Sequence, residues 1–314
     1  MKKNIVLFSC CFIYLFCSCR YDIDDNLEIS QTIITPPELP VDKDDQFVAT
    51  DGAVYFTGME NCTGGSYSAN SNNLLENLQL ASNMPASFDL SMYLPPIGNQ
   101  GKQGSCTSWA TTYYMKSMQE RIQSGAPYSA ATIMSPAYTY NQITQGNCKG
   151  TSFENTLEIL KDKGAPPLSV FPYVDISCIV QPSSAQNILA APNKISRYKY
   201  LSGVKIVLEM KTLLMLKSPI LISVFLTSKF AIKDQYGLTA YRPHAISPNQ
   251  KGLCHAMLVV GYSDQYEAFK VVNSWGADWG DRGFLWIDYS AFSQIYDLSN
   301  SFKVINQAIV VYDL

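Results

Sequence analysis

One cysteine of this chain stands where a glycine-containing turn runs into an apolar segment with helical spacing. The stretch is Asn99 to Ala110, NQGKQGSCTSWA, and the cysteine is Cys106. A helix that begins after Ser105 places the Cys106 sulfur in its first turn, where unpaired backbone N–H groups and the helix dipole favour a thiolate. A thiolate is a nucleophile, and catalysis by it needs a base, a group that orients the base and donors for an oxyanion.

The chain offers two candidates for the base, because it contains only two histidines. His244 stands in a proline-containing, loop-like segment, whereas His255 begins the alternating apolar run 256–262. A side chain at the end of a strand is held more rigidly than one on a loop, which favours accurate placement of a base. We therefore expect His255 to accept the Cys106 proton.

Two amide side chains are placed to complete the site. Asn273 ends a strand-like run, and its oxygen is expected to accept a ring N–H of His255 and fix the tautomer of the base. Trp275, two residues later, is expected to shield that hydrogen bond from water. Gln100 stands six residues before Cys106 across the turn, and its amide N–H₂ is expected to bind an oxyanion together with the Cys106 backbone N–H.

Three blocks of the sequence, in this order, resemble the signature blocks of papain-like cysteine peptidases: NQGKQGSCTSWA, CHAMLVVGY and VNSWGADWGDRGFLWI. The resemblance covers about residues 84 to 314. His255 lies 149 residues after Cys106, within the roughly 130 to 150 typical of the family, and Asn273 lies 167 residues after it, which a few extra loop residues would explain. The resemblance implies Cys106 as nucleophile, His255 as general acid and base, Asn273 as orienting group and Gln100 as oxyanion donor.

The same resemblance implies a fold and a reaction. We expect an α+β fold with two lobes and the active cleft between them: a helical lobe with Cys106, and an antiparallel, barrel-like β lobe with His255 and Asn273. The expected reaction is hydrolysis of peptide bonds through an acyl-thioenzyme. Two alternatives stay open. One is a catalytically idle surface protein that uses the papain fold for binding, and the other is an acyl transferase of the same triad that uses an amine in place of water.

The chain departs from the family around its nucleophile. Gln103 stands where a cysteine is usual, so the disulfide that commonly braces this turn cannot form, and Thr107 stands where a tryptophan is usual. No segment resembles a long helical inhibitory propeptide. Whether residues 47–83 cover the site is left open.

The glycine-rich block that lines the substrate groove in the family is reduced here to a short run. We expect Lys149, Gly150 and Thr151, together with Trp275, to bind substrate. Four cysteines apart from Cys106 lie beyond the N-terminal 20 residues. The resemblance favours a disulfide between two of them, Cys148 and Cys178. For Cys254, next to the base, an inert buried thiol and a functional one both stay open.

Helical and strand patterns place these residues on different elements. The apolar spacing after Ser105 predicts a helix that ends near Gly125, and Thr151 and Glu154 have the spacing of a capping box before a second helix. Further patterns predict a helix at 205–217, short strands at 47–49 and 53–56, and strands at 220–226, 256–262, 268–272, 283–288 and 307–312. We expect a helical lobe at about 84–195 and a β lobe at about 196–314.

The N-terminus has the pattern of an export signal. Lys2 and Lys3 precede the apolar run 5–16, which is shorter than the ~20 residues of a membrane span. The run ends in FCSC, which resembles a loose bacterial lipobox, so we expect residues 1–18 to be a lipoprotein signal peptide and Cys19 to carry the lipid. An ordinary secretory signal that is cut nearby is the alternative.

The segment that follows the signal is expected to be an acidic tether and N-terminal segment, 19–83. Between residues 20 and 60, ten acidic residues stand against Arg20 and Lys43. This composition fits a solvated linker between a membrane and a folded body. The protein is then exported to the cell envelope, and the acidic run after Cys19 resembles a signal for display on the outer-membrane surface.

Composition narrows the classes of partner. The formal charge of −3 and the lack of a basic, aromatic-interleaved patch argue against nucleic acid. No His/Cys cluster has metal-ligand spacing, so we expect no metal and no cofactor. With 314 residues, 47% of them apolar, the chain is long enough for a sizeable core. We expect a monomer that binds protein or peptide substrates.

Overall fold

The computed structural model describes residues 45–60, 78–202, 204–242, 253–293 and 304–314. All of them belong to one contact unit, Pro37–Leu314. The predicted signal peptide, the predicted lipid anchor Cys19 and the rival base His244 lie outside the described residues. No helix in the described part of the chain is long and apolar enough to cross a membrane.

A single helical rod follows the turn and carries Cys106 at its start. It consists of α1 (Cys106–Ser108), the π-helix Trp109–Lys116 and α2 (Ser117–Ser124). Gly125 ends the rod in the left-handed region, at φ 67°, with its N–H bonded to the Arg121 carbonyl oxygen. The helix predicted after Ser105 is therefore confirmed, although its central turns have π-helical hydrogen bonding that the apolar spacing does not distinguish.

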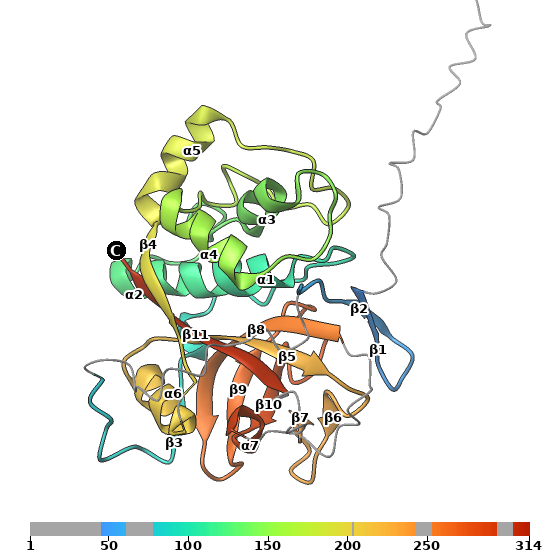
Figure 1. Ribbon diagram of the computed structural model, residues 1–314, viewed down its shortest axis with the longest axis vertical. Coiled ribbons are helices and arrows are strands. Elements are labelled where there is room, and N and C mark those ends of the chain that lie inside the picture. Colours follow the sequence, from blue (N-terminus) through green and yellow to red (C-terminus); the bar gives the residue numbers. More distant parts are fainter. Residues whose placement is uncertain (1–44, 61–77, 203, 243–252, 294–303) are drawn as a thin grey trace, which may run out of the picture. The chain divides into compact units, whose positions relative to one another are not determined.

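The other helices of this lobe lie beside the rod, at the end of the molecule away from the large sheet (Figure 1). They are α3 (Pro136–Thr144), α4 (Phe153–Asp162) and α5 (Ser184–Ala190), followed by a 3₁₀ turn, Ala191–Asn193. The second predicted helix is confirmed as α4, but its cap was assigned one residue early. Ser152 is the N-cap, because its hydroxyl accepts the Asn155 N–H. Thr151 lies outside the helix and bonds elsewhere.

The second half of the chain builds a large sheet, which within the described residues has nine strands in the order β4-β11-β5-β8-β9-β10-β7-β6, with β3 paired to β8. Its strands are β3 (Ser87–Asp89), β4 (Ile195–Tyr200), β5 (Ile220–Leu226), β6 (Ile232–Lys233), β7 (Thr239–Tyr241), β8 (Leu253–Ser263), β9 (Ala268–Val272), β10 (Phe284–Asp288) and β11 (Ile305–Asp313). Neighbouring strands are antiparallel, except β7 and β10. The predicted strands and the α+β fold class are confirmed.

Smaller elements complete the structure. They are the hairpin β1 (Gln46–Val48) and β2 (Val54–Phe56), a 3₁₀ turn at Ser91–Tyr93, and the helices α6 (Ile206–Met215) and α7 (Ser290–Ser293). The hairpin strands pair antiparallel, with Phe47 opposite Tyr55. Both expected short strands and the expected helix at 205–217 are therefore present.

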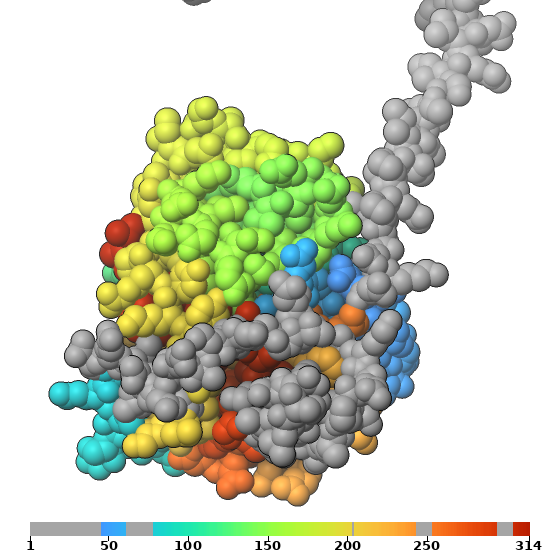
Figure 2. Space-filling view, viewed as in Figure 1, coloured from blue at the N-terminus to red at the C-terminus, as the bar shows by residue number. Residues whose placement is uncertain are grey.

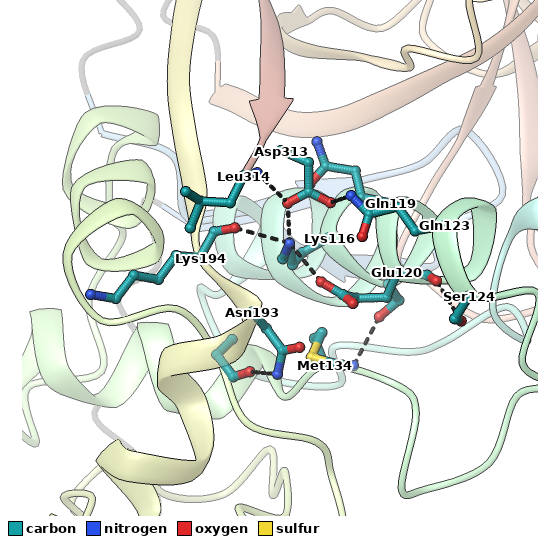
Figure 3. A network of polar contacts seen from close by, with 12 residues as sticks. Lys116, Gln119, Glu120, Gln123, Ser124, Met134, Asn193, Lys194, Asp313 and Leu314 are labelled. Carbon is teal, nitrogen blue, oxygen red and sulfur yellow. Dashed lines mark hydrogen bonds and ion pairs between the residues drawn. The ribbon is translucent and has the colours of Figure 1, made fainter.

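A buried ammonium group joins the helical rod to the C-terminus of the chain (Figure 3). Lys116, at the end of the π-helix, is 1% exposed and pairs with Asp313 at the end of β11 and with Glu120, 2.7 Å away. Its Nζ also donates to the Lys194 carbonyl oxygen at 3.1 Å. A buried charge is tolerated only when paired and hydrogen-bonded, so these contacts fix the rod against the edge of the sheet.

Candidate active site

The start of the helical rod meets the middle of the sheet at Cys106. The Cys106 side chain is fully buried, and the backbone N–H of Ala256 in β8 donates to its sulfur at 3.5 Å. Cys106 and Ala256 are 150 residues apart in sequence. The contact between α1 and β8 therefore brings the predicted nucleophile to the residue next to the predicted base, His255.

His255 and Asn273 form a short hydrogen bond, 2.6 Å between Nε2 and Oδ1. The Ser274 N–H donates to the same oxygen at 2.7 Å. Because that N–H is only a donor, the atom that it faces is the amide oxygen, and the His255 Nε2 must carry a hydrogen. The Nδ1 nitrogen of His255 is then an unprotonated acceptor, and it has no hydrogen-bond partner among the described residues.

Trp275 shields the pair from one side. Its ring stacks on His255 with centroids 4.5 Å apart and an interplanar angle of 27°. Trp275 is 4% exposed, and its Nε1–H donates to the Phe56 carbonyl oxygen at 2.7 Å. The indole thus excludes water from the imidazole and is itself held by the end of the hairpin strand β2.

Gln100 lies in the turn before Cys106 and is bound from both lobes. Its backbone N–H donates to the Ser274 carbonyl oxygen at 2.8 Å, and the Ser274 hydroxyl donates to its Oε1 at 2.6 Å. The amide oxygen therefore points to Ser274 and the amide nitrogen away from it. That nitrogen donates to the carbonyl oxygens of Gln103, at 2.8 Å, and of Thr57, at 3.1 Å. In this structure the amide donors expected for an oxyanion hold two carbonyl groups.

The Thr57 carbonyl belongs to a short stretch, Thr57–Glu60, that we call the covering segment. It runs from the hairpin between the two lobes. Met59 forms a parallel bridge with Thr151 of the helical lobe and an antiparallel bridge with Cys254 of β8. The Thr151 N–H donates to the Gly58 carbonyl oxygen at 2.8 Å, and the Glu60 N–H donates to the Thr151 carbonyl oxygen at 3.0 Å.

Glycines allow the covering segment to lie against the turn of the nucleophile. A Cβ at Gly58 would lie 2.3 Å from backbone atoms of Gly104, and one at Gly150 would lie 2.8 Å from the Gly58 carbonyl oxygen. Gly58 also has φ +103°, which side chains rarely adopt. Residues 45–60, coloured blue, lie at the surface where the helical lobe adjoins the rest of the molecule (Figure 2). The covering segment thus lies against Gly104, two residues before the fully buried Cys106.

Aromatic stacking anchors the hairpin that leads into the covering segment. Tyr55 stacks on Trp275 with centroids 4.7 Å apart, and Phe47 does so at 5.9 Å. Phe47 also meets Phe230 edge to face at 5.6 Å. Aromatic pairs of this kind contribute roughly 0.5–1.5 kcal/mol each beyond the area that they bury. The hairpin thus covers the indole face that lies beyond the base.

Burial sets the protonation states of the covered site. It raises the pKa of the Cys106 thiol to about 12, and the nearby Asp45 carboxylate acts in the same direction. The backbone N–H groups of Ala256, Thr107 and Cys106 oppose this shift but are outweighed. The expectation of a thiolate is therefore wrong for the covered form, because the effect of the helix start is smaller than the loss of water. Burial also lowers the pKa of His255 to about 4, against the effect of the Asn273 bond.

Three of the four residues expected to bind substrate contact the covering segment or the hairpin. The exception is the Lys149 side chain. Gly150 and Thr151 contact Gly58 as described, and Trp275 contacts the hairpin. Lys149 is exposed, and its carbonyl oxygen accepts the Tyr140 hydroxyl at 2.9 Å. The Lys149 backbone therefore helps to position residues 149–151. Among the described residues, no hydrogen bond or ion pair joins the Lys149 side chain to the covering segment.

The two departures from the family are compensated by hydrogen bonds. The Gln103 amide donates to the Ser177 carbonyl oxygen at 3.3 Å, in place of the missing disulfide. The Thr107 hydroxyl bonds the Thr151 hydroxyl, which ties the start of the rod to the run that holds the covering segment.

Among the described cysteines, three are bonded in disulfides. Cys148 and Cys178 form a disulfide with each other. Cys254 is also disulfide-bonded, so the reading of it as an inert thiol is wrong. Its partner lies outside the described residues, because among these only Cys106 is a free thiol.

Comparison with known proteins agrees with this geometry. The sequence profile described as "Papain family cysteine protease" matches residues 84–302. The chain belongs to the papain family. It is 30% identical over 207 residues to gamete and mating-type specific protein A of Dictyostelium discoideum (64% of this chain, 42% of that protein) and 28% identical over 201 residues to a cathepsin L-like proteinase of Fasciola hepatica (62% and 56%). The chain thus spans about half the length of these relatives.

Solved structures share the fold. Xylellain, a cysteine protease from Xylella fastidiosa, superimposes with a TM-score of 0.60 at 21% identity, over 74% of this chain and 88% of that one. Digestive procathepsin L2 from Tenebrio molitor gives 0.56 at 23% identity, over 76% and 71%. These likenesses support the two-lobe architecture and say nothing further about the chemistry.

Sequence reasoning missed the covering segment. The sequence leaves open whether residues 47–83 cover the site, because four residues that bond by backbone atoms leave almost no side-chain pattern. The available signals were the paired short strands of the hairpin and Gly58, whose need for a glycine becomes evident only from the position of Gly104.

A methyl group at Gly58 should displace the covering segment. For Gly58→Ala we expect alkylation of Cys106 by iodoacetamide to be more than about tenfold faster than in the wild type, because a clash at 2.3 Å costs more than the 1.4 kcal/mol of a tenfold change. Gly52→Ala is the matched control: Gly52 lies in the same hairpin at φ +85° with nothing within 4 Å of its Cβ position. Equal rates in the two variants would contradict this reading. Peptide mass spectrometry identifies the alkylated cysteine.

Acid should favour displacement of the covering segment. The covered site holds His255 neutral down to about pH 4, whereas an uncovered imidazole titrates near its ordinary 6.5. Between these values the uncovered form binds a proton that the covered form lacks, so covering is stabilised above pH 6.5 and weakens as the pH falls, by up to roughly tenfold per unit.

Hydrogen exchange measures this dependence in a Cys106→Ala protein. The protection factors of the Thr151 and Glu60 amides, corrected for intrinsic exchange, should fall between pH 6.5 and pH 4. Amides of the β5–β8 ladder provide the control and should keep their protection. Constant protection of Thr151 across this range would exclude a role for His255 in covering.

Proposed function

We propose that this chain is a cysteine peptidase that hydrolyses peptide bonds through an acyl-thioenzyme. The observation that carries the proposal is the arrangement at the lobe junction: Cys106 at the start of a helix, against the strand that bears His255, with Asn273 bonded to the far nitrogen of that ring. This is the spatial order that a nucleophile, a base and an orienting group need.

Each residue has a defined step. The unprotonated Nδ1 of His255 takes the Cys106 proton, and the Asn273 oxygen holds the resulting imidazolium through Nε2–H. The sulfur attacks the substrate carbonyl, and the oxyanion is bound by the Cys106 N–H and by the Gln100 amide hydrogen that Thr57 occupies in the covered form. His255 then returns its proton to the leaving amine. Water, deprotonated by His255, releases the acyl group.

The covered form is latent in this proposal. Three features support latency: the thiol is buried, its pKa is raised, and an oxyanion donor is bound to Thr57. Displacement of the covering segment admits water, and this lowers the pKa of Cys106 toward the range of a reactive thiol. The segment also models how an extended peptide binds, through the N–H and the carbonyl oxygen of Thr151.

A pair of glutamines tests the oxyanion assignment. In a Gly58→Ala background we expect Gln100→Ala to lower kcat for a fluorogenic peptide library by roughly 10²–10³, the typical loss of one oxyanion donor. Gln103→Ala is the control, since its side chain lies in the same turn but bonds the Ser177 carbonyl, and its kcat should fall far less. Cys106→Ala should abolish turnover. Similar losses in both glutamine variants would assign Gln100 to the fold alone.

The two alternative functions are outcomes of the same assay. An uncovered protein that never reacts with an epoxide thiol-peptidase probe would be an idle binding protein. Products that carry an added primary amine in place of water would identify an acyl transferase.

We further propose that the protein is exported and anchored to the cell envelope, at the outer-membrane surface, by a lipid on Cys19, and that it is a monomer. The lipobox-like sequence and the acidic tether support anchoring, and the disulfides fit an oxidising compartment. Metabolic labelling with palmitate should label the wild type but not Cys19→Ala, with Cys17→Ala as the matched control. Label that survives in Cys19→Ala would place the lipid elsewhere.

A further inference from the structure

One phenol bonds both ends of the turn that carries the oxyanion donors. The Tyr173 hydroxyl donates to the Gln100 carbonyl oxygen at 2.8 Å and lies 2.9 Å from the Ser105 hydroxyl. A phenol has one hydrogen, which the Gln100 carbonyl oxygen accepts, so the Ser105 hydroxyl is the donor in the second bond. Gln100 carries one proposed oxyanion donor, and Ser105 directly precedes the Cys106 N–H, which is the other. Tyr173 therefore joins the residues on which both donors depend.

Packing holds the Tyr173 ring in place independently of its hydroxyl. The ring meets Trp109 edge to face, with centroids 4.9 Å apart. Trp109 lies in the rod, three residues after Cys106, so the ring is fixed to the element that carries the nucleophile. The Ser105 hydroxyl makes no capping bond to α1, and Tyr173 is its partner in place of the helix.

The residues that follow Tyr173 hold the same turn. We call residues 173–177 the bracing segment. The Lys102 N–H donates to the Asp175 carboxylate at 3.4 Å, and the Gln103 amide donates to the last carbonyl oxygen of the segment at 3.3 Å. Both bonds are longer than those of the phenol, so Tyr173 makes the tightest of these contacts with the turn.

The turn is shaped for the close approach of the bracing segment. Gly101 has φ +60°, and a Cβ there would collide with the Asp175 carboxylate. The residue after the segment is Cys178, whose disulfide with Cys148 fixes it to the loop before residues 149–151. The helical lobe thus holds the turn on one side, while Ser274 of the β lobe holds it on the other.

We propose that Tyr173 is a positioning residue of the oxyanion site, whose hydroxyl fixes the Gln100 amide relative to the Cys106 backbone N–H. This role rests on the proposed peptidase function, since both donors serve the acyl-transfer step. Donors stabilise an oxyanion only when they are aimed at its position beforehand. In the covered form the Gln100 amide donates to the Thr57 carbonyl oxygen at 3.1 Å, so the braced turn has a geometry that holds a peptide oxygen.

Removal of the hydroxyl alone tests this role in the Gly58→Ala background. Tyr173→Phe keeps the ring and its contact with Trp109. We expect kcat for a fluorogenic peptide to fall by roughly 10–10², because a donor misplaced by about 1 Å can cost 10²-fold. KM should change little, since the interaction is made in the transition state. Tyr138→Phe is the matched control: its hydroxyl, in the same lobe, donates to Asn187 of α5 at 2.7 Å, and the variant should keep the kcat of the parent.

Two further measurements distinguish positioning from general support of the fold. Iodoacetamide is attacked at a saturated carbon, so its reaction with Cys106 forms no oxyanion, and Tyr173→Phe should be alkylated as fast as the parent. The second measurement is hydrogen exchange of the Gln100 and Ser105 amides, which bond carbonyl oxygens at 2.8 Å. Their exchange should be faster in Tyr173→Phe and unchanged in Tyr138→Phe, and this readout needs no activity.

The outcomes separate the role of Tyr173 from the peptidase. If the parent hydrolyses peptides and Tyr173→Phe keeps its kcat, the positioning role fails and the peptidase stands. If kcat and the alkylation rate fall together, Tyr173 supports the fold alone and the positioning role fails. If the parent is alkylated but hydrolyses no peptide, the peptidase fails. Faster exchange of the two turn amides in Tyr173→Phe then supports the positioning role, and unchanged exchange overturns it.

Discussion

The structure depends on one contact between distant parts of the chain, that of the first turn of the Cys106 helix with the backbone of β8 at Ala256. It places the Cys106 sulfur against the residue that follows His255 in β8, and it exists only while the two lobes keep a fixed position relative to each other. Gln100 and Ser274 fix that position beside the site, with two hydrogen bonds of 2.8 and 2.6 Å. The Tyr114 hydroxyl adds a third bond of this kind, to the Asn273 carbonyl oxygen at 2.9 Å. Farther along the rod, the contacts of Lys116 with Asp313 and the Lys194 carbonyl oxygen also hold the two lobes together.

Features with local causes could be predicted from the sequence. The rod after Ser105 follows from a period of 3.6 in apolar residues, and the strands β5 and β9 follow from short, nearly continuous apolar runs. The lobe boundaries remain a prediction. In the structure, segments on both sides of the helices cross between the lobes: β3 pairs with β8 of the sheet before the helices begin, and Asp313 at the end of β11 pairs with Lys116 of the rod.

Features that depend on tertiary contacts could not be predicted. The thiol is expected to ionise because the helix start is visible in the sequence, whereas the burial that raises its pKa depends on contacts between distant parts of the chain, such as that with Ala256 in β8. Cys254 is ambiguous in the sequence because its type and position do not distinguish a free thiol from a bonded one. Gly58 has no local signature at all, because what forbids a side chain there is the backbone of Gly104.

The covering segment is held by a near balance of opposing free energies. Thr57–Glu60 gains three hydrogen bonds to the site, from Gln100, to Gly58 and from Glu60, each worth about 0.5–1.5 kcal/mol net. Against this stand roughly 1–2 kcal/mol of backbone entropy for each of the four ordered residues. Burial of the Met59 side chain adds roughly 1.5–3 kcal/mol. The free energy that holds the segment is therefore small, and its occupancy depends on the elements at its two ends. The aromatic stacking of Tyr55 and Phe47 on Trp275 holds one end, and the β-bridge of Met59 with Cys254 holds the other. If either contact is lost, the covering segment is held only weakly. Substrate then competes with it for the same backbone groups of Thr151.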